Sequence, residues 1–311
     1  MNSSYVAPAW LPGGHLQTIY ASLRPPPAVP LTRERWETPD GDFIDVDFAG
    51  DPAARRLAVL FLGLEGASDS HYARAFAAHA ARAGLRVAMP HWRGCSGELN
   101  RLPRAYHSGD SAEVDWIMRR LAGSAAERYA VGISLGGNVL LKWLGELGAG
   151  AAALVRRAAS VCAPIDVGAA GRALDRGLNR FFYTRMFLST LKPKSLQKLE
   201  AFPGLFDAGR TARARTFREF DDAVTAPLHG FRDADHYWGA ASSAPYLKSI
   251  RVPTLLLNTR NDPFLPEHDL LAATRDASPS LLLEFPRTGG HVGFPGRRDW
   301  LPRRLLDFLL T

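Results

Sequence analysis

The sequence has little cysteine and lacks any long apolar run. Its 311 residues include two cysteines, Cys95 and Cys162, which are too few for a disulfide scaffold. No stretch approaches the roughly 18 consecutive apolar residues of a membrane-spanning helix. The first 11 residues contain no basic segment followed by an apolar one, as a secretory signal would. We therefore expect a cytoplasmic protein whose Cys162, within an apolar strand-like run, is a buried free thiol.

Metal-ligand spacings and long basic runs are also missing. Histidine and acidic residues are scattered, and no H-x-x-x-H or C-x-x-C spacing occurs, so we expect neither a metal nor a cofactor. The net charge is +7, but the basic residues are dispersed and form no nucleic-acid patch. We expect no nucleic-acid partner and at most a weak attraction to anionic membrane surfaces.

Strand and helix patterns alternate along most of the chain. Continuous apolar runs such as residues 56–62 are typical of parallel strands that are buried on both faces. The alternation predicts an α/β fold with a mostly parallel central sheet and helices on both faces. The expected strands are 33–38, 43–48, 56–62, 85–89, 128–131, 158–163, 254–257 and 281–285, and the expected helices are 71–83, 112–121, 138–147, 267–275 and 299–310.

The alternation stops between residues 165 and 249. Helical patterns occur there, and prolines, among them Pro193, are expected to interrupt them. Helices inserted between two strands of a parallel sheet predict a cap. The first 30 residues are rich in proline and glycine and are predicted to run extended over the surface. The expected parts are an N-terminal arm (1–30), an α/β core (31–164 and 250–311) and a helical cap (165–249).

Aromatic residues are dense in the expected cap. Aromatic side chains at helical spacing mostly pack against neighbouring helices, so we expect most of them to form the core of the cap. The others are expected to line an apolar pocket for an acyl chain. The aromatic residues concerned are Phe181, Phe182, Tyr183, Phe187, Phe202, Phe206, Phe217, Phe220, Phe231, Tyr237 and Trp238.

A serine flanked by glycines follows one of the expected strands. Residues 131–138, VGISLGGN, contain the pattern G-x-S-x-G with Ser134 at its centre. A short apolar strand precedes the pattern and a helix follows it, which is the context of a nucleophile elbow. Gly132 and Gly136 allow the neighbouring backbone to pass close to a sharp turn. We predict that this turn raises the Ser134 hydroxyl above the sheet.

Two more candidates for catalysis follow later strands. Functional groups of open parallel sheets lie beyond the carboxyl ends of strands, and Asp262 and His291 occupy such positions. Along the chain the serine comes first, the aspartate second and the histidine third, which is the order of the catalytic residues in folds with a nucleophile elbow. A serine hydroxyl needs an adjacent base, and imidazole titrates near neutral pH. We therefore predict Ser134 as nucleophile, His291 as base and Asp262 as the acid that orients it.

Each of these assignments has an alternative. Asp262 precedes Pro263, and an aspartate before a proline commonly starts a turn. His15, His71 and His107 compete for the role of the base. His291 is favoured over them because it alone follows the last strand with glycines on both sides.

Two backbone N–H groups are the expected oxyanion donors. The N–H of Leu135 follows the serine, and the N–H of Leu64 follows the strand that ends in Leu62-Gly63. Donors of this kind stabilise the negative charge that develops on a tetrahedral intermediate.

Several longer motifs extend over nearly the whole chain. They are GGHLQTIY (13–20), GLEGASDSHY (63–72), HWRGCSGELNRLPRAYHSGD (91–110), VGISLGGN (131–138), FREFDDAVTAPLHGF (217–231) and NDPFLP (261–266). Together they resemble the YheT-like branch of the α/β hydrolases. That branch includes bacterial predicted hydrolases, eukaryotic α/β-hydrolase-domain esterases and phospholipases, and yeast medium-chain fatty acid ethyl ester synthase/esterases.

The resemblance implies an α/β-hydrolase fold with a helical cap and ester hydrolysis by a triad that falls on Ser134, Asp262 and His291. The chain departs from the family in three places. Leu62-Gly63 replaces a usual His-Gly, which implies an oxyanion loop that is less firmly placed. The acidic pair before Pro-Phe is Asn261-Asp262, and a tyrosine pair of the cap is His236-Tyr237.

The sequence therefore predicts a serine carboxylesterase for short- to medium-chain acyl esters, with a small-molecule or lipid-like ester as substrate. The same triad could transfer the acyl group to an alcohol. The third alternative is an inactive hydrolase fold that only binds its ligand. A carboxylate-dependent epoxide hydrolase or dehalogenase is disfavoured, because Ser134 stands at the nucleophile position.

Overall fold

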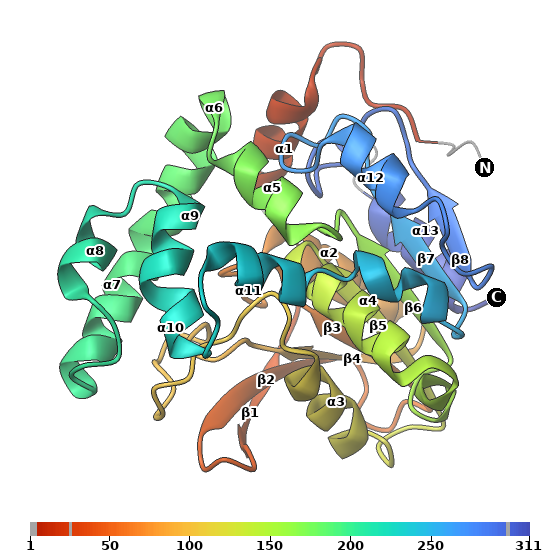
Figure 1. Ribbon diagram of the computed structural model, residues 1–311. Coiled ribbons are helices and arrows are strands. Elements are labelled where there is room, and N and C mark those ends of the chain that lie inside the picture. The colour runs from red at the N-terminus through yellow and green to blue at the C-terminus, as the bar shows by residue number, and fades with distance from the viewer. Residues whose placement is uncertain (1–4, 25–26, 297–298) are drawn as a thin grey trace.

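A mostly parallel sheet forms the centre of the molecule (Figure 1). The structure is a computed structural model that describes residues 5–24, 27–296 and 299–311. In this part of the chain eight strands lie in the order β1-β2-β4-β3-β5-β6-β7-β8. The pairs β1–β2 and β2–β4 are antiparallel and the others parallel. The strands are β1 Thr32–Glu37, β2 Phe43–Ala49, β3 Arg56–Phe61, β4 Leu85–Pro90, β5 Glu127–Ile133, β6 Arg157–Val161, β7 Thr254–Leu257 and β8 Leu281–Glu284.

The sheet register brings the ends of four strands to one level. Ile133 pairs with Val161, Val161 with Leu257, and Leu257 with Glu284. The strands β5 to β8 therefore deliver the following loops to the same edge of the sheet. This edge is where an open parallel sheet places its functional groups.

Helices cover both faces of the sheet, so the predicted α/β class is confirmed (Figure 1). Helices α3 and α4 pack together on one face, and α2 and α13 pack together on the other. These helices bury the apolar side chains on both faces of strands such as β3 and β5. The helices of the core are α2 His71–Arg82, α3 Ser111–Arg120, α4 Leu135–Leu147, α12 Glu267–Ala273 and α13 Trp300–Leu309, with 3-10 turns at Gly148–Ala153 and Ala244–Ser249.

A group of helices lies between β6 and β7 in the chain, in the region for which the sequence predicts a cap, and is called the cap below. The expected interruption at Pro193 is wrong, because α7 continues through this proline. Leu188 and Lys198 are buried on either side of it, and the Lys198 ammonium donates to the carbonyl of Asn100 at 2.6 Å. Tertiary contacts thus hold both halves of the helix in line. The inserted helices are α5 Val167–Leu174, α6 Gly177–Asn179, α7 Arg185–Ala201, α8 Ala208–Arg213, α9 Phe217–Phe220, α10 Ala226–Leu228 and α11 Ala234–Ala241, with π-helical turns at Arg180–Thr184 and Asp221–Thr225.

The N-terminal segment is not extended throughout. Residues 1–4 and 25–26 of the predicted arm lie outside the described residues, and helix α1 spans Gly14–Ser22. Gln17 of this helix is 1% exposed and its side chain reaches the loops that follow β7 and β8. These hydrogen bonds and the close packing of Gly14 against the Asn261 backbone explain why the segment is ordered.

Both cysteines are free and buried, as expected for Cys162. The thiol of Cys95 is buried as well, although its neighbours Gly94 and Ser96 predict a polar turn. Within the described ranges, none of the helices has the length and apolar character needed to cross a membrane.

Candidate active site

Ser134 lies on a strained turn between β5 and α4. Its φ and ψ angles are 52° and −118°, in a region that residues other than glycine rarely adopt. A Cβ atom on Gly136 would lie 2.6 Å from the carbonyl oxygen of Leu62, and one on Gly132 would lie 2.6 Å from the Cα of Gly137. The two glycines are therefore required by close backbone contacts. The strand, turn and helix have the geometry predicted from the G-x-S-x-G pattern.

A hydrogen-bonded relay starts at this serine. The Ser134 Oγ lies 2.9 Å from Nε2 of His291, and Nδ1 of His291 lies 2.8 Å from Oδ2 of Asp262. The Asp262 side chain is fully buried and the His291 side chain is 11% exposed. Oδ1 of Asp262 also accepts the backbone N–H of Phe264 at 2.8 Å. Asp262 thus does both things that the sequence suggested for it: it stabilises the turn before Phe264 and it hydrogen-bonds to His291.

Among the described residues, His291 is the histidine that hydrogen-bonds to the Ser134 hydroxyl, and His15, His71 and His107 have other contacts. The His15 ring stacks on Tyr183, with ring centroids 5.8 Å apart. His71 contacts the carbonyl of Val292 at 3.4 Å, and burial lowers its pKa. Burial also lowers the pKa of His107, which packs against His229. The geometry therefore favours His291 as the base.

The predicted oxyanion donors have no intramolecular acceptor in the part of the chain that the structure describes. The N–H groups of Gly63 and Glu65, on either side of Leu64, donate to the hydroxyls of Tyr72 and Tyr106 at 3.0 Å. The N–H of Leu135 begins helix α4 and is likewise unpaired. A helix N-terminus and an unpaired N–H favour negative charge nearby.

The loop that carries Leu64, one of the predicted oxyanion donors, is held more firmly than Leu62-Gly63 implies. The Trp92 indole donates to the carbonyl of Leu62 at 2.8 Å, which adds to the two tyrosine contacts. The aromatic residues of the 63–72 and 91–110 motifs therefore support a loop that lacks the usual histidine.

Two residues of α1 were missed as positioning residues by the sequence analysis. The Gln17 Oε1 accepts the side-chain amide of Asn261 at 2.9 Å and the N–H of Gly289 at 2.8 Å. The Thr18 hydroxyl accepts the N–H of His291 at 2.8 Å. These bonds join the loop of Asp262 to the loop of His291. The signal for them in the sequence was the polar pair Gln17-Thr18 within the motif GGHLQTIY.

Replacing Gln17 with leucine is expected to lower kcat by about 10- to 100-fold, because it leaves the Gly289 N–H and the Asn261 amide unsatisfied and loosens the relay. Steady-state kinetics on a soluble ester would measure the effect. Ser22→Ala, on the same helix but exposed, should leave kcat unchanged. Equal kcat for Gln17→Leu and the parent protein would refute this positioning role.

The comparisons with known proteins agree with this architecture. Residues 59–296 match a family model described as alpha/beta hydrolase fold. The chain is 36% identical to the Escherichia coli protein named "Putative esterase YheT", over 96% of this chain and 90% of the relative. The chain belongs to the YheT-like branch of the α/β-hydrolase family. It is also 27% identical to human phospholipase ABHD3, over 94% of this chain and 74% of that protein.

Solved α/β hydrolases share the fold at low sequence identity. The esterase Pf2001 of Pyrococcus furiosus aligns with a TM-score of 0.59 and 14% identity, covering 100% of this chain and 97% of that one. At this identity the likeness supports the fold alone.

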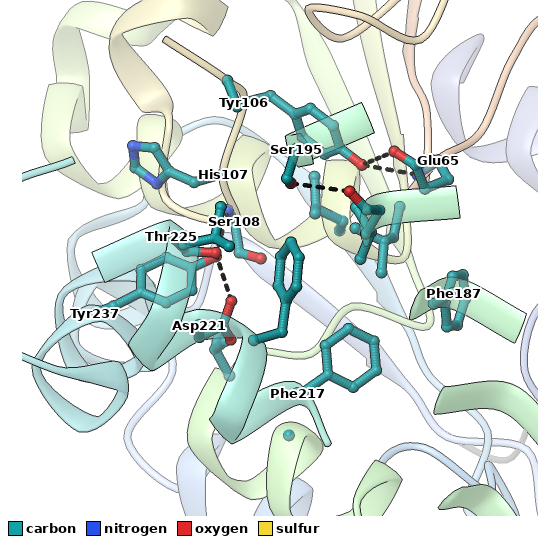
Figure 2. A pocket seen from close by; sticks show the side chains of 18 of the residues that line it. Glu65, Tyr106, His107, Ser108, Phe187, Ser195, Phe217, Asp221, Thr225 and Tyr237 are labelled. Atoms are coloured by element: carbon teal, nitrogen blue, oxygen red, sulfur yellow. Dashed lines mark hydrogen bonds between the residues drawn. The ribbon is translucent and has the colours of Figure 1, made fainter. Parts of the chain in front are cut away.

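In this α/β hydrolase a pocket that includes Ser134 and His291 is lined by residues of the core and of the cap. Figure 2 shows part of its lining, with Tyr106 and His107 from the core and Phe187 and Phe217 from the cap. The pocket encloses about 1310 Å³ of empty space, including its open mouth. Its walls are mostly apolar, and Phe187 and Phe217 border it together with the polar Asp221 and Thr225. Several cap aromatics thus line the pocket, as expected. The lining aromatics from the cap are Phe187, Phe206, Phe217, Phe220, Tyr237 and Trp238.

Asp221 is a buried acid in the wall of this pocket. Its Oδ2 accepts the indole N–H of Trp238 at 2.7 Å, and its Oδ1 accepts the hydroxyl of Thr225 at 2.6 Å. Burial raises the pKa of Asp221 to about 7. The carboxyl therefore keeps its proton in mildly acidic solution and joins two cap helices as a neutral group.

The titration of Asp221 should make folding stability depend on pH. The unfolded carboxyl ionises near 3.8 and the folded one near 7, so its stabilising contribution is complete below about pH 4 and is lost as the pH rises to 7. The loss is on the order of 4 kcal/mol at most. Asp221→Asn cannot ionise, and its amide suits both partners. Urea unfolding of both proteins at about pH 5 and pH 8 should show a smaller decrease for the variant; equal decreases would contradict the assignment.

One group of metal-type ligands occurs in the described ranges, formed by Cys162, Asp262 and His291. Two of the three are already hydrogen-bonded to each other, and a cation there would replace the contact between Asp262 and His291. Burial raises the pKa of the Cys162 thiol, which disfavours the thiolate that a metal needs. The donor set therefore fits a proton relay better than a metal centre.

Proposed function

We propose that the protein is a serine carboxylesterase that cleaves short- to medium-chain acyl esters through an acyl-serine intermediate. The observation that carries the proposal is the hydrogen-bonded series Ser134–His291–Asp262 on a strained turn beside an apolar pocket. The names of the relatives, an esterase and a phospholipase, support ester bonds as the substrate class.

In the first half of the proposed reaction, His291 Nε2 removes the proton of Ser134 as Oγ attacks the ester carbonyl. The negative oxygen of the tetrahedral intermediate accepts the N–H groups of Leu135 and Leu64. Asp262 stabilises the imidazolium, which then protonates the departing alcohol. The products of this half are the free alcohol and an acyl-Ser134 ester.

In the second half, water takes the place of the alcohol. His291 removes a proton from this water, which attacks the acyl-serine carbonyl, and the same two N–H groups hold the second oxyanion. Return of the proton to Ser134 Oγ releases the carboxylic acid. The apolar pocket walls provide a surface for the acyl chain.

A panel of p-nitrophenyl esters of increasing acyl length tests the proposal. We expect hydrolysis of the short and medium chains and a decline when the chain exceeds the pocket. Product analysis with an added alcohol separates hydrolysis, which gives the free acid, from acyl transfer, which gives a new ester. No turnover of any ester in the panel would favour an inactive binding protein instead.

A further inference from the structure

Helix α1 has its apolar residues on the side that faces solvent. Leu16, Ile19 and Leu23, spaced three and four residues apart, are 50%, 39% and 77% exposed. The opposite side carries the buried Gln17, which contacts the loops of Asp262 and His291. A surface helix of a globular protein normally buries its apolar side. The exposed side of α1 is therefore not accounted for by the packing of this chain.

A second exposed apolar group lies where the cap begins. It follows one side of the helical segment formed by α6, the π-helical turn Arg180–Thr184 and α7. Its members, each more than half exposed, are Leu178, Phe181, Phe182 and Met186. They contribute neither to the buried cap clusters nor to the walls of the pocket. Phe181 and Phe182 are thus exceptions to the expectation that the cap aromatics form core or pocket.

These two groups are neighbours. His15 of α1 stacks on Tyr183 of the π-helical turn, and both segments lie along the same side of the molecule (Figure 1). Trp10, 63% exposed, packs edge-on against Tyr20 and extends the surface of α1. We name this surface the apolar patch; it comprises Trp10, Leu16, Ile19, Leu23, Leu178, Phe181, Phe182 and Met186.

The apolar patch is close to the proposed chemistry. The ring of Tyr183 lies 4.6 Å from that of Phe264, and Phe264 lies 4.2 Å from the ring of His291. Phe264 and His291 both line the pocket. The buried Tyr183, which directly follows Phe181 and Phe182 in the chain, therefore links the segment of the patch through Phe264 to the wall of the pocket.

The two chain segments that carry the apolar patch contain basic residues and no acidic ones. Residues 1–33 and 176–199 contain no aspartate or glutamate. Arg176, Arg180 and Arg185 are exposed among the apolar residues of the cap, and none of them forms a salt bridge within the described residues. Arg24 extends over the ring of Tyr20 at the end of α1. Exposed apolar side chains flanked by unpaired arginines are complementary to an anionic lipid surface.

We propose that the apolar patch docks the protein on anionic lipid surfaces, where the ester pocket receives lipid-like substrates. The aromatic and aliphatic side chains would insert between the acyl chains, and the arginines would contact the anionic headgroups. The choice of substrate rests on the proposed esterase function, but the binding itself does not require turnover.

Vesicle sedimentation with the Ser134→Ala protein tests the binding without hydrolysis. Vesicles of phosphatidylglycerol mixed with phosphatidylcholine should retain the protein, and phosphatidylcholine alone should retain much less. Phe181→Ser/Phe182→Ser should weaken binding by at least about tenfold, because two apolar anchors are lost. Phe181→Leu/Phe182→Leu should retain most of it. Arg180→Glu should weaken binding by at least about fivefold.

The matched control is Arg82→Glu on α2, which changes the net charge equally at an exposed site outside the apolar patch. If Arg82→Glu weakens binding as much as Arg180→Glu, or if Phe181→Ser/Phe182→Ser binds like the parent, the patch is not the docking surface. Self-association through the patch, seen as a dimer that Phe181→Ser/Phe182→Ser dissociates and that does not bind vesicles, would also overturn the proposal. Hydrolysis of a soluble ester, measured with Ser134 intact, reports on the proposed function separately and should not change with Phe181→Ser/Phe182→Ser.

Discussion

Ser134→Ala is expected to lower kcat for a soluble p-nitrophenyl ester by about 10⁶-fold, to the level left by binding and the oxyanion donors. Alanine lacks the oxygen that forms the acyl-enzyme, and water in the pocket would have to attack the ester directly. KM should change little, since the apolar walls remain.

The fold should tolerate this substitution. The backbone of Ser134 donates to Val161 at 2.8 Å, and alanine keeps that bond. Circular dichroism and thermal unfolding should therefore match the parent protein. Ser124→Ala serves as the matched serine control and should retain full activity, because Ser124 lies in the turn before β5, at the opposite end of this strand from Ser134. Parent-like turnover by a folded Ser134→Ala protein would exclude the serine mechanism.

Asp262→Asn is expected to lower kcat at neutral pH by about 10⁴-fold. The asparagine oxygen can still accept the N–H of Phe264, as Oδ1 of Asp262 does, so the turn is retained. The amide nitrogen then faces Nδ1 of His291 and donates to it. The favoured tautomer carries its proton on Nε2, which can no longer accept the proton of Ser134.

The loss in Asp262→Asn should occur in kcat with an unchanged fold. Asp269→Asn is the matched control, because it removes another contact between aspartate and histidine, that of the half-buried Asp269 with the exposed His268. We expect parent-like kinetics for this control. A loss in Asp262→Asn of less than tenfold would show that Asp262 serves only the turn that precedes Phe264.

The sheet and the members of the proposed triad could be predicted because their signals are local. Each parallel strand is a short apolar run, and Ser134, Asp262 and His291 each follow one of these runs. The sequence order and the register of the sheet together bring their loops to one edge. Knowledge of how strands end in this type of sheet was sufficient to group the three residues.

The residues that hold the loops of the site in place could not be predicted in this way, because they act through contacts between segments that are distant in the sequence. Gln17 contacts Gly289, which lies 272 positions further along the chain. Its helix has polar residues inside and apolar residues outside, so periodicity gave no indication of its orientation. The uninterrupted course of α7 through Pro193 likewise depends on contacts with the 91–110 loop.

Reaction with a fluorophosphonate, followed by peptide mass spectrometry, tests most directly whether Ser134 is the nucleophile of an esterase. The phosphonate replaces the ester carbonyl, and only a serine hydroxyl activated by a neighbouring base attacks it readily. We expect one adduct, on the peptide that contains Ser134, with parallel loss of ester hydrolysis and no adduct in Ser134→Ala. Full hydrolytic activity with Ser134 unlabelled, or labelling of another residue that removes the activity, would contradict the assignment of Ser134 as the nucleophile.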